Sequence, residues 1–159
     1  MRWIPCFALV GVLFGLALLG PPTYSRAQAD KPASTDSAKA VKQLVASFYD
    51  SLSAGKAEDN RKLFLSEDVT VVGVARGEGA EKVWQKKAAA VIKSWQDDGA
   101  AKHTIDSVEV ELVDDALAVA RVKLHTDFIK ARAVFTLTSE GGTWRIASYV
   151  FETRLPDQK

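Results

Sequence analysis

The first regular pattern in the chain is an apolar face at helical spacing. It begins after Asp36 or Ser37, either of which suits a helix N-cap, and it ends before Gly55, which suits a left-handed C-terminal cap. Between these points, apolar side chains recur every three or four residues, which predicts an amphipathic helix. Its buried face would consist of Val41, Leu44, Val45, Phe48 and Leu52.

The next part of the chain predicts two more helices, separated by a strand and a loop. A short helix is expected over residues 56–65 and a longer one over residues 80–95. Residues 69–72 predict a short strand, and the glycine-rich residues 73–79 predict a loop. The apolar face of the longer helix would consist of Trp84, Ala88, Val91 and Trp95.

The C-terminal half alternates apolar and polar residues, which is typical of strands with one buried face. A bulged turn after the first of these strands would pair Val110 with Ala118 and keep both apolar sets on one face. The last hairpin turns near Gly141, and its predicted register places Ser148 opposite Ala133 on the inner face. Helices followed by a meander of strands predict an α+β fold.

The N-terminal segment is predicted to be a secretory signal peptide. Arg2 precedes an apolar run over residues 3–19, and a small-x-small cleavage motif ends at Ala29. The competing interpretation is a retained membrane anchor, but the run is slightly short for a span of ~20 residues. We expect cleavage, so the protein would be exported, periplasmic or secreted, and would keep no stable membrane anchor. The predicted parts are a signal peptide at residues 1–29, a flexible lead at 30–36 and a domain at 37–155.

Composition and charge narrow the classes of function. Of the 159 residues, 47% are apolar and 26% are charged, which is typical of a soluble globular domain. The formal net charge is +1, from 21 basic and 20 acidic side chains, so no long-range field favours nucleic acid as a partner. The sole cysteine, Cys6, lies in the predicted signal peptide, so the mature domain would have no thiol chemistry.

Four short motifs follow one another in a set order. They are FYDSLSAGK at residues 48–56, LFLSEDV at 63–69, DALAVARV at 115–122 and GTWRI at 142–146. Together they resemble the NTF2-like superfamily, in particular its SnoaL-like and lumazine-binding-like groups, although Lys56 stands where the family usually has Asp. The resemblance implies an NTF2-like cone over residues 38–153, with three N-terminal helices packed on a curved antiparallel sheet. It also implies a pocket between helices and sheet, but no particular reaction.

The residues argue against the best-known chemistry of that superfamily. Its ketosteroid isomerase uses a tyrosine and two carboxyl groups, and the resemblance places these positions at Phe48, Gly73 and Val134, where none can perform its role. Tyr49 is one residue away, which is about 100° around a helix. An unusual cyclase, dehydratase or isomerase stays an alternative. Its base would be Asp106, because alternation places Asp106 on the inner sheet face.

The sizes of the inner residues favour a ligand pocket. Small side chains such as Ala133 face large flat rings, which leaves either a packed core or a hollow lined by aromatic groups. The preferred hypothesis is an exported, non-catalytic domain that binds a small, mostly apolar or aromatic ligand in the cone, without a cofactor. Its predicted site consists of Phe48, Leu52, Trp84, Trp95, Asp106, Ala133, Phe135, Trp144 and Ser148.

The remaining features are assigned to the surface. His103 and His125 would face each other on the wetter sheet face as ordinary surface histidines, and no metal site is predicted. Lysines within residues 80–95 are expected on a solvated helix face. An alternative function is homodimer formation through an apolar patch on the outer sheet face. That patch would consist of Val119, Val134, Tyr149 and Phe151.

Overall fold

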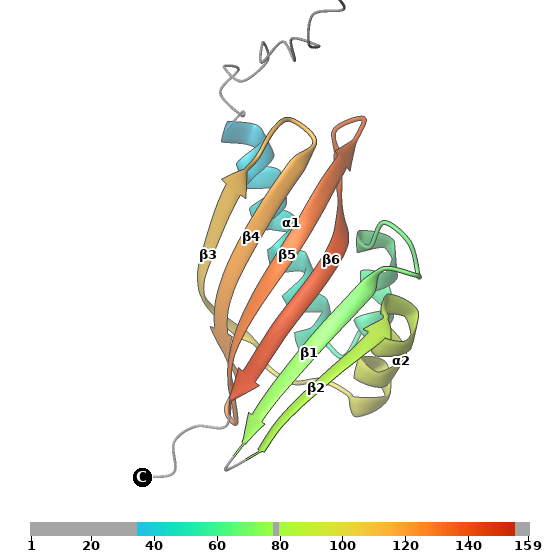
Figure 1. Cartoon of the computed structure of the whole chain (residues 1–159), viewed down its shortest axis with the longest axis vertical. Helices are drawn as coiled ribbons and strands as arrows, with labels where there is room; N and C mark the ends of the chain where they lie inside the picture. The colour runs from blue at the N-terminus through green and yellow to red at the C-terminus, as the bar shows by residue number, and fades with distance from the viewer. Residues whose placement is uncertain (1–34, 78–79, 155–159) are drawn as a thin grey trace, which may run out of the picture. The chain divides into compact units, whose positions relative to one another are not determined.

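The computed structural model describes residues 35–77 and 80–154. The predicted signal peptide lies outside the described residues, and the predicted lead reaches into them because the first helix begins at Thr35. None of the described helices is both long and apolar enough to cross a membrane. The elements (Figure 1) are helix α1 (Thr35–Ser53), the 3₁₀ helix η1 (Ala57–Leu63), strands β1 (Thr70–Gly77) and β2 (Ala80–Lys87), helix α2 (Ala88–Asp98), and strands β3 (Thr104–Leu112), β4 (Leu117–His125), β5 (Lys130–Glu140) and β6 (Thr143–Arg154).

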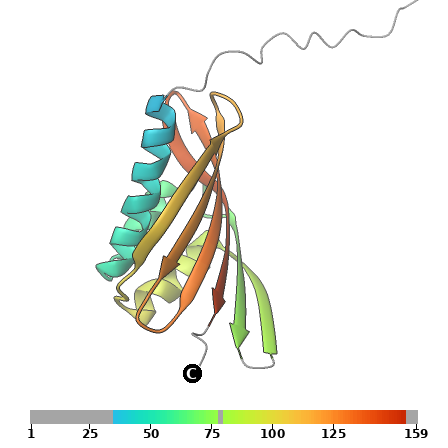
Figure 2. The same cartoon turned by 90° about the vertical axis from the view of Figure 1, so that its left-hand side faces the viewer.

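The six strands form one sheet with the order β2-β1-β6-β5-β4-β3. Strand β1 runs parallel to β6, whereas the other neighbouring pairs are antiparallel. The fold is therefore α+β with a curved sheet, as predicted, but the sheet is mixed rather than wholly antiparallel. Figure 2 shows the sheet edge-on, with α1 lying across its concave face. The apolar face of α1 and the inner side chains of the strands form the core between them.

Helix α1 forms where the apolar spacing predicts it, and its C-terminal cap is confirmed. Gly55 has φ +68°, in the left-handed region that glycine adopts without strain. The backbone N–H of Lys56 then donates to the carbonyl of Ser51 at 2.8 Å, which satisfies one of the carbonyls at the helix end. The buried residues of α1 are Val41, Val45, Phe48, Tyr49 and Leu52.

The helix predicted over residues 80–95 is wrong in its first half. Residues 80–87 form β2, which pairs with β1 along its whole length, and the helix proper covers residues 88–98. The Ala, Glu, Lys and Gln residues of this segment favour a helix intrinsically. Pairing with a neighbouring strand overrides that preference. Trp84 therefore lies on a strand and Trp95 on a helix, so they do not share a helical face.

The start of α2 is held by the backbone that precedes β1. The N–H of Ala88 donates to the carbonyl of Val69 at 2.8 Å, and the N–H of Ala89 donates to the carbonyl of Glu67 at 3.2 Å. The first N–H groups of a helix lack partners within it, so these bonds satisfy two of them. Since η1 replaces the α-helix predicted over residues 56–65, the described part of the chain has two α-helices rather than three.

The glycine-rich segment predicted as a loop also belongs largely to the sheet. Strand β1 continues to Gly77, and Gly73 pairs with Trp84 on β2. A β-carbon at Gly73 would lie 2.3 Å from the six-membered ring of Trp84, which is far too close. Glycine is thus required here for close approach of an indole to the backbone.

The β3–β4 hairpin has the predicted face pattern in a different register. Val110 pairs with Ala120 rather than with Ala118. A shift of two residues keeps the same side chains on the inner face, so the core is unaffected. A bulge at Asp106 interrupts the ladder and breaks the alternation that placed this carboxylate inside.

One bulge in β6 reverses which of its later side chains face the core. The ladder between β5 and β6 shifts by one residue at Ala147, and a strand changes face at every residue. Ser148, predicted inside, therefore lies on the outer face, whereas Tyr149 and Phe151, predicted outside, face the core. The predicted outer patch loses both rings, although Val134 is 39% exposed there. A homodimer through this face stays a prediction.

Candidate functional site

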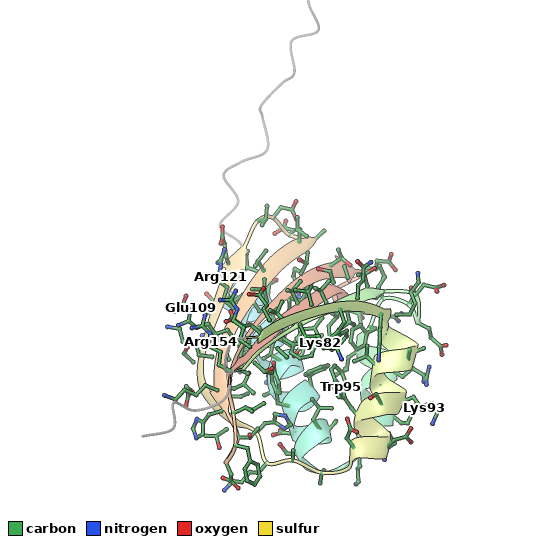
Figure 3. All side chains as sticks on the ribbon, turned by 60° about the horizontal axis from the view of Figure 1, so that its bottom comes forward. Lys82, Lys93, Trp95, Glu109, Arg121 and Arg154 are labelled. Atoms are coloured by element: carbon green, nitrogen blue, oxygen red, sulfur yellow. The ribbon has the colours of Figure 1, made fainter. Side chains whose placement is uncertain are left out.

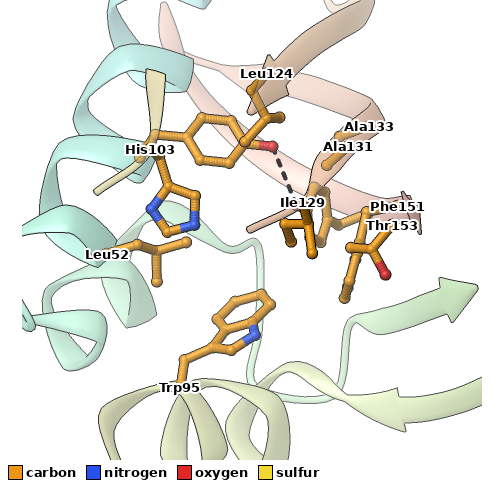
Figure 4. A pocket seen from close by; sticks show the side chains of 11 residues that line it. Leu52, Trp95, His103, Leu124, Ile129, Ala131, Ala133, Phe151 and Thr153 are labelled. Carbon is orange, nitrogen blue, oxygen red and sulfur yellow. Dashed lines mark hydrogen bonds between the residues drawn. The ribbon is translucent and has the colours of Figure 1, made fainter. Parts of the chain in front are cut away.

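A cavity of about 140 Å³ lies between the helices and the concave face of the sheet, and we call it the cone cavity (Figure 4). It receives side chains from α1, α2, the segment before β3, and strands β4, β5 and β6. The residues that line it are Tyr49, Leu52, Trp95, His103, Leu124, Ile129, Ala131, Ala133, Tyr149, Phe151 and Thr153.

The space exists because β5 carries two small residues where its neighbours carry rings. Ala131 and Ala133 both line the cavity, and Ala133 pairs with Phe151 on β6. The next inward residue of β5, Phe135, is completely buried, and its ring lies 4.5 Å from that of Tyr149. The cone cavity therefore lies beside Ala131 and Ala133 and ends at Phe135.

Three rings form an apolar wall, in which the indole of Trp95 is tilted steeply against the stacked rings of Tyr149 and Phe151. The rings of Tyr149 and Phe151 stack with their centroids 5.2 Å apart and 26° between their planes. The indole of Trp95 lies 6.1 Å from Tyr149 and 6.2 Å from Phe151. Beneath them, Phe48 contacts both Tyr149 at 5.3 Å and Trp95 at 5.8 Å. Aromatic contacts of this kind add stability beyond the buried area, so the wall is held in place by its own neighbours.

The polar part of the cavity begins with a pair of tyrosine hydroxyls. The Tyr49 hydroxyl on α1 lies 3.1 Å from the Tyr149 hydroxyl on β6, as the dashed line in Figure 4 shows. Burial raises the pKa of both phenols, so both are neutral at physiological pH. One hydroxyl donates to the other, and within residues 35–77 and 80–154 neither has a further hydrogen bond. The pair thus keeps one hydrogen to donate to a ligand.

His103 supplies a second neutral polar group. Its backbone N–H donates to Ser53 Oγ at 3.0 Å, and its Nδ1 lies 3.3 Å from the same oxygen. The imidazole lies 5.7 Å from the ring of Tyr49. Burial lowers the pKa of His103, and a hydrogen bond with the backbone of Ala101 offsets part of this effect. The ring is therefore uncharged at neutral pH and offers a donor or an acceptor according to its tautomer.

A family model described as "Putative lumazine-binding" matches residues 36–152. The chain belongs to this family. The match covers nearly all of the described domain, including every residue that lines the cone cavity except Thr153. Among proteins with curated functions, none matches the chain.

Solved structures of NTF2-like proteins share the fold of this family member. An NTF2-like protein of unknown function from Methylobacillus flagellatus has a TM-score of 0.60 at 18% identity, over 77% of this chain and 95% of its own. One from Shewanella baltica has a TM-score of 0.58 at 18% identity, over 72% and 91%. A "putative scytalone dehydratase" from Novosphingobium aromaticivorans has a TM-score of 0.57 at 14% identity, over 79% and 93%. At these identities the likeness shows the fold alone, which is NTF2-like as predicted.

The cone cavity of this lumazine-binding family member brings together some of the predicted site residues and leaves out others. Phe48 and Phe135 are completely buried beneath the cavity and form part of the core. Trp144 is buried near the β5–β6 turn, where it pairs with Ser139. Trp84 lines a separate pocket between β2 and α2. The predicted residues that do line the cone cavity are Leu52, Trp95 and Ala133.

The predictions that Asp106 lies on the inner face and that His103 faces His125 are wrong, whereas His125 is exposed as predicted. Asp106 Oδ1 lies 2.9 Å from His125 Nδ1, and the Asp106 side chain is 49% exposed. A carboxylate in water is not the buried base that the enzyme hypothesis requires, so that hypothesis is overturned. His125 therefore pairs with Asp106, while His103 lies at the cavity and not opposite His125. In the described ranges, no group of three or more His, Cys, Asp or Glu residues is placed to hold a metal.

The sequence pattern does not place the polar side chains that line the cavity, which belong to Tyr49, His103, Tyr149 and Thr153. Tyr49 is one residue from Phe48, but the buried face of a helix is wider than one residue and includes both. Tyr149 was hidden by the bulge at Ala147, which has no signal in the sequence. His103 precedes β3 in a segment without apolar periodicity, and its position follows from its contact with α1.

Proposed function

We propose that this domain binds a small, uncharged, mostly apolar or aromatic molecule in the cone cavity without changing it chemically. The observation that carries this proposal is the lining, in which flat rings and small aliphatic side chains surround a few neutral hydrogen-bonding groups. Linings of this kind are typical of small-molecule sites. Membership of a family described as lumazine-binding supports a role in ligand binding.

The volume favours a ligand with about the bulk of one ring. An engineered apolar cavity of ~150 Å³ in another protein holds benzene, and the cone cavity has about 140 Å³. A two-ring heterocycle would have to extend beyond the cavity. The stacked rings of Tyr149 and Phe151 provide a flat surface against which a planar molecule would lie.

The lining also favours a neutral ligand. The residues that line the cavity include no Lys, Arg, Asp or Glu, and an ion without a partner in an apolar site costs far more than a neutral polar group. The Tyr49–Tyr149 pair and His103 are uncharged at neutral pH, as their pKa shifts indicate. A ligand with one hydroxyl or carbonyl group directed at the tyrosine pair would satisfy the site.

Matched one-ring probes test the proposal. Phenol carries a hydroxyl that can bond to the tyrosine pair, whereas benzoate is of similar size but charged. We expect phenol to raise the melting temperature of the protein, and we expect benzoate not to compete with phenol for the cone cavity. If phenol, other neutral planar heterocycles and lipids all fail to raise the melting temperature, and a crystal structure shows the cavity filled by side chains, the proposal is wrong.

A pair of Ala→Leu variants locates the binding. Ala131→Leu would fill the cone cavity and is expected to weaken phenol binding by about tenfold or more. Ala90→Leu, on the exposed face of α2, adds the same atoms away from the cavity and serves as the matched control. Equal phenol affinity in the two variants would place the binding elsewhere.

We also propose that the chain is exported and that residues 1–29 are removed. The support is the order of Arg2, the apolar run and the small residues up to Ala29 in the sequence. Mass spectrometry of the protein from separated cell fractions tests this. A mature N-terminus at Asp30 in the exported fraction is expected, and an intact N-terminus in the cytoplasmic fraction would contradict it.

A further inference from the structure

A second pocket lies between β2 and α2, and we call it the β2–α2 pocket. It has a volume of about 260 Å³, and its lining includes Lys82, Trp84, Lys86, Trp95 and Asp98. Trp95 also lines the cone cavity, so its indole belongs to the walls of both spaces. The two linings otherwise share no residue.

Strand alternation places two lysines in this pocket. Lys82, Trp84 and Lys86 project from the same face of β2 because they are two residues apart. Lys86 pairs with Val71, which is completely buried, so this face is the concave one. Figure 3 shows Lys82 beneath the sheet, whereas Lys93 points outward from α2. Lys82 and Lys86 are exposed, as predicted, but they lie on a strand and not on a helix face.

The indole of Trp84 is fixed at the centre of the pocket. Gly73 leaves room for the ring to lie directly on the backbone of β1. The ring of Phe151 meets the Trp84 indole nearly at right angles, with the centroids 5.4 Å apart. Trp84 is only partly buried, so it keeps ring surface for another molecule. A rigid, partly exposed indole is a stacking surface for a planar ligand.

The charge of the pocket is positive. Neither Lys82 nor Lys86 has an ion pair within residues 35–77 and 80–154. The ammonium of Lys86 lies 5.5 Å from the centroid of the Trp84 ring, which is within the range of a cation–π contact. Asp98 is the one acidic residue in the lining. Two ammonium groups beside one carboxylate leave a net charge that an anion would neutralise.

We propose that the β2–α2 pocket is a second binding site, for a planar aromatic anion that stacks on Trp84 and places its negative group between Lys82 and Lys86. Ring and charge are both needed, because the indole supplies the flat contact and the two ammonium groups supply charge-assisted hydrogen bonds. The site differs in class from the cone cavity, whose lining carries no ionised group. It stands whether or not the cone cavity binds a ligand.

Calorimetric titration of the full-length protein with 2-naphthoate tests this site, with 2-naphthamide as its neutral analogue. We expect 2-naphthoate to bind more tightly than 2-naphthamide. Added salt should weaken the binding of 2-naphthoate and leave that of 2-naphthamide unchanged. The double variant Lys82→Gln/Lys86→Gln should weaken 2-naphthoate binding by about tenfold and leave the amide unchanged. The matched control is Lys39→Gln/Lys42→Gln on α1, which removes the same charge from exposed positions outside the pocket and should bind as the parent does.

Three results would overturn the proposal. The first is equal affinity of the two double variants for 2-naphthoate, and the second is no binding of 2-naphthoate by the parent protein. The third is loss of 2-naphthoate binding in Ala131→Leu, because that variant blocks the cone cavity and leaves the β2–α2 pocket intact. Trp84→Leu should weaken both the acid and the amide, since it removes the stacking surface and keeps the lysines. This pattern separates the ring contact from the charge.

Discussion

The two pockets beside Trp95 are opposite in polarity although they share a wall. The cone cavity has a lining of rings, aliphatic side chains and neutral polar groups, and its tyrosine hydroxyls bond to each other at 3.1 Å. The β2–α2 pocket has two lysines without ion pairs among the described residues and one aspartate. Their difference follows from position in the sheet. The cone cavity lies over the middle strands, while β2 is an edge strand whose inner residues reach solvent.

This contrast teaches that one curved sheet can build two kinds of site on the same face. Over the middle strands the cavity is lined by buried residues such as Leu124, Ala133 and Tyr149, so an unpaired charge is costly and neutral groups remain. At the edge, long lysine side chains can lie on an aromatic ring while their ammonium groups stay hydrated.

The largest effect is expected from Trp95→Ala, which removes the wall between the pockets. Its indole contacts Phe48, Tyr149 and Phe151, so we expect the free energy of unfolding to fall by about 3 kcal/mol. The two pockets of this variant should also discriminate less well between phenol and 2-naphthoate. Urea unfolding and competition titrations measure the two effects. Trp95→Phe keeps a ring in place and should recover most of the stability and most of the discrimination between ligands. If Trp95→Ala kept two intact, independent sites, Trp95 would not be a wall that the pockets share.

Gly73→Ala should disturb the β2–α2 pocket and leave the cone cavity intact. The added methyl group would lie 2.3 Å from the Trp84 ring, so the indole must move, at a cost of about 2 kcal/mol in unfolding free energy. Affinity for 2-naphthoate should fall, while phenol affinity should stay within about twofold. Gly77→Ala, at the exposed end of β1, is the control for the general effect of replacing a strand glycine. Unchanged tryptophan fluorescence in Gly73→Ala would show that Trp84 does not depend on this glycine.

Variants of the tyrosine pair test whether its hydroxyls form the polar end of the cone cavity. Tyr149→Phe removes one partner of a buried hydrogen bond and should cost about 1 kcal/mol in unfolding free energy. Combined with Tyr49→Phe, the losses should be less than additive, because both changes break the same bond. Phenol should lose affinity in either variant while benzene, which has no hydroxyl, should not. Additive losses in the double-mutant cycle would mean that the hydroxyls do not interact.

The smallest effect is expected from the titration of His103. Burial lowers its pKa in the folded protein, so on acidification the unfolded chain takes up a proton before the folded one does. The stability contributed by the neutral imidazole is therefore present above about pH 6.5 and is lost as the pH falls below that value. His103→Asn should remove this part of the stability loss at acidic pH. Urea unfolding at a series of pH values measures the change. His125→Asn, on the exposed side of β4, should retain this loss.

The elements that could be predicted from the sequence are those whose signal is local. The apolar spacing from Val41 to Leu52 and the glycine at position 55 define α1 without help from the rest of the fold. Residues 80–87 show the opposite case, since their side chains favour a helix and only the pairing with β1 makes them a strand.

The candidate site depended on two features that leave no local signal. The bulge at Ala147 decides that Tyr149, and not Ser148, faces the cavity. The bulge at Asp106 decides that this carboxylate meets water and His125 rather than a ligand. A single extra residue reverses every later position of a strand, so alternation could predict the faces only up to each bulge.

A crystal structure of the protein with phenol would show where the ligand binds. Our account predicts electron density for the ring between Trp95 and Ala133, against the stacked rings of Tyr149 and Phe151, with the phenol oxygen within hydrogen-bonding distance of the Tyr49–Tyr149 pair. A cone cavity closed by its own side chains, or phenol bound only outside it, would contradict the account.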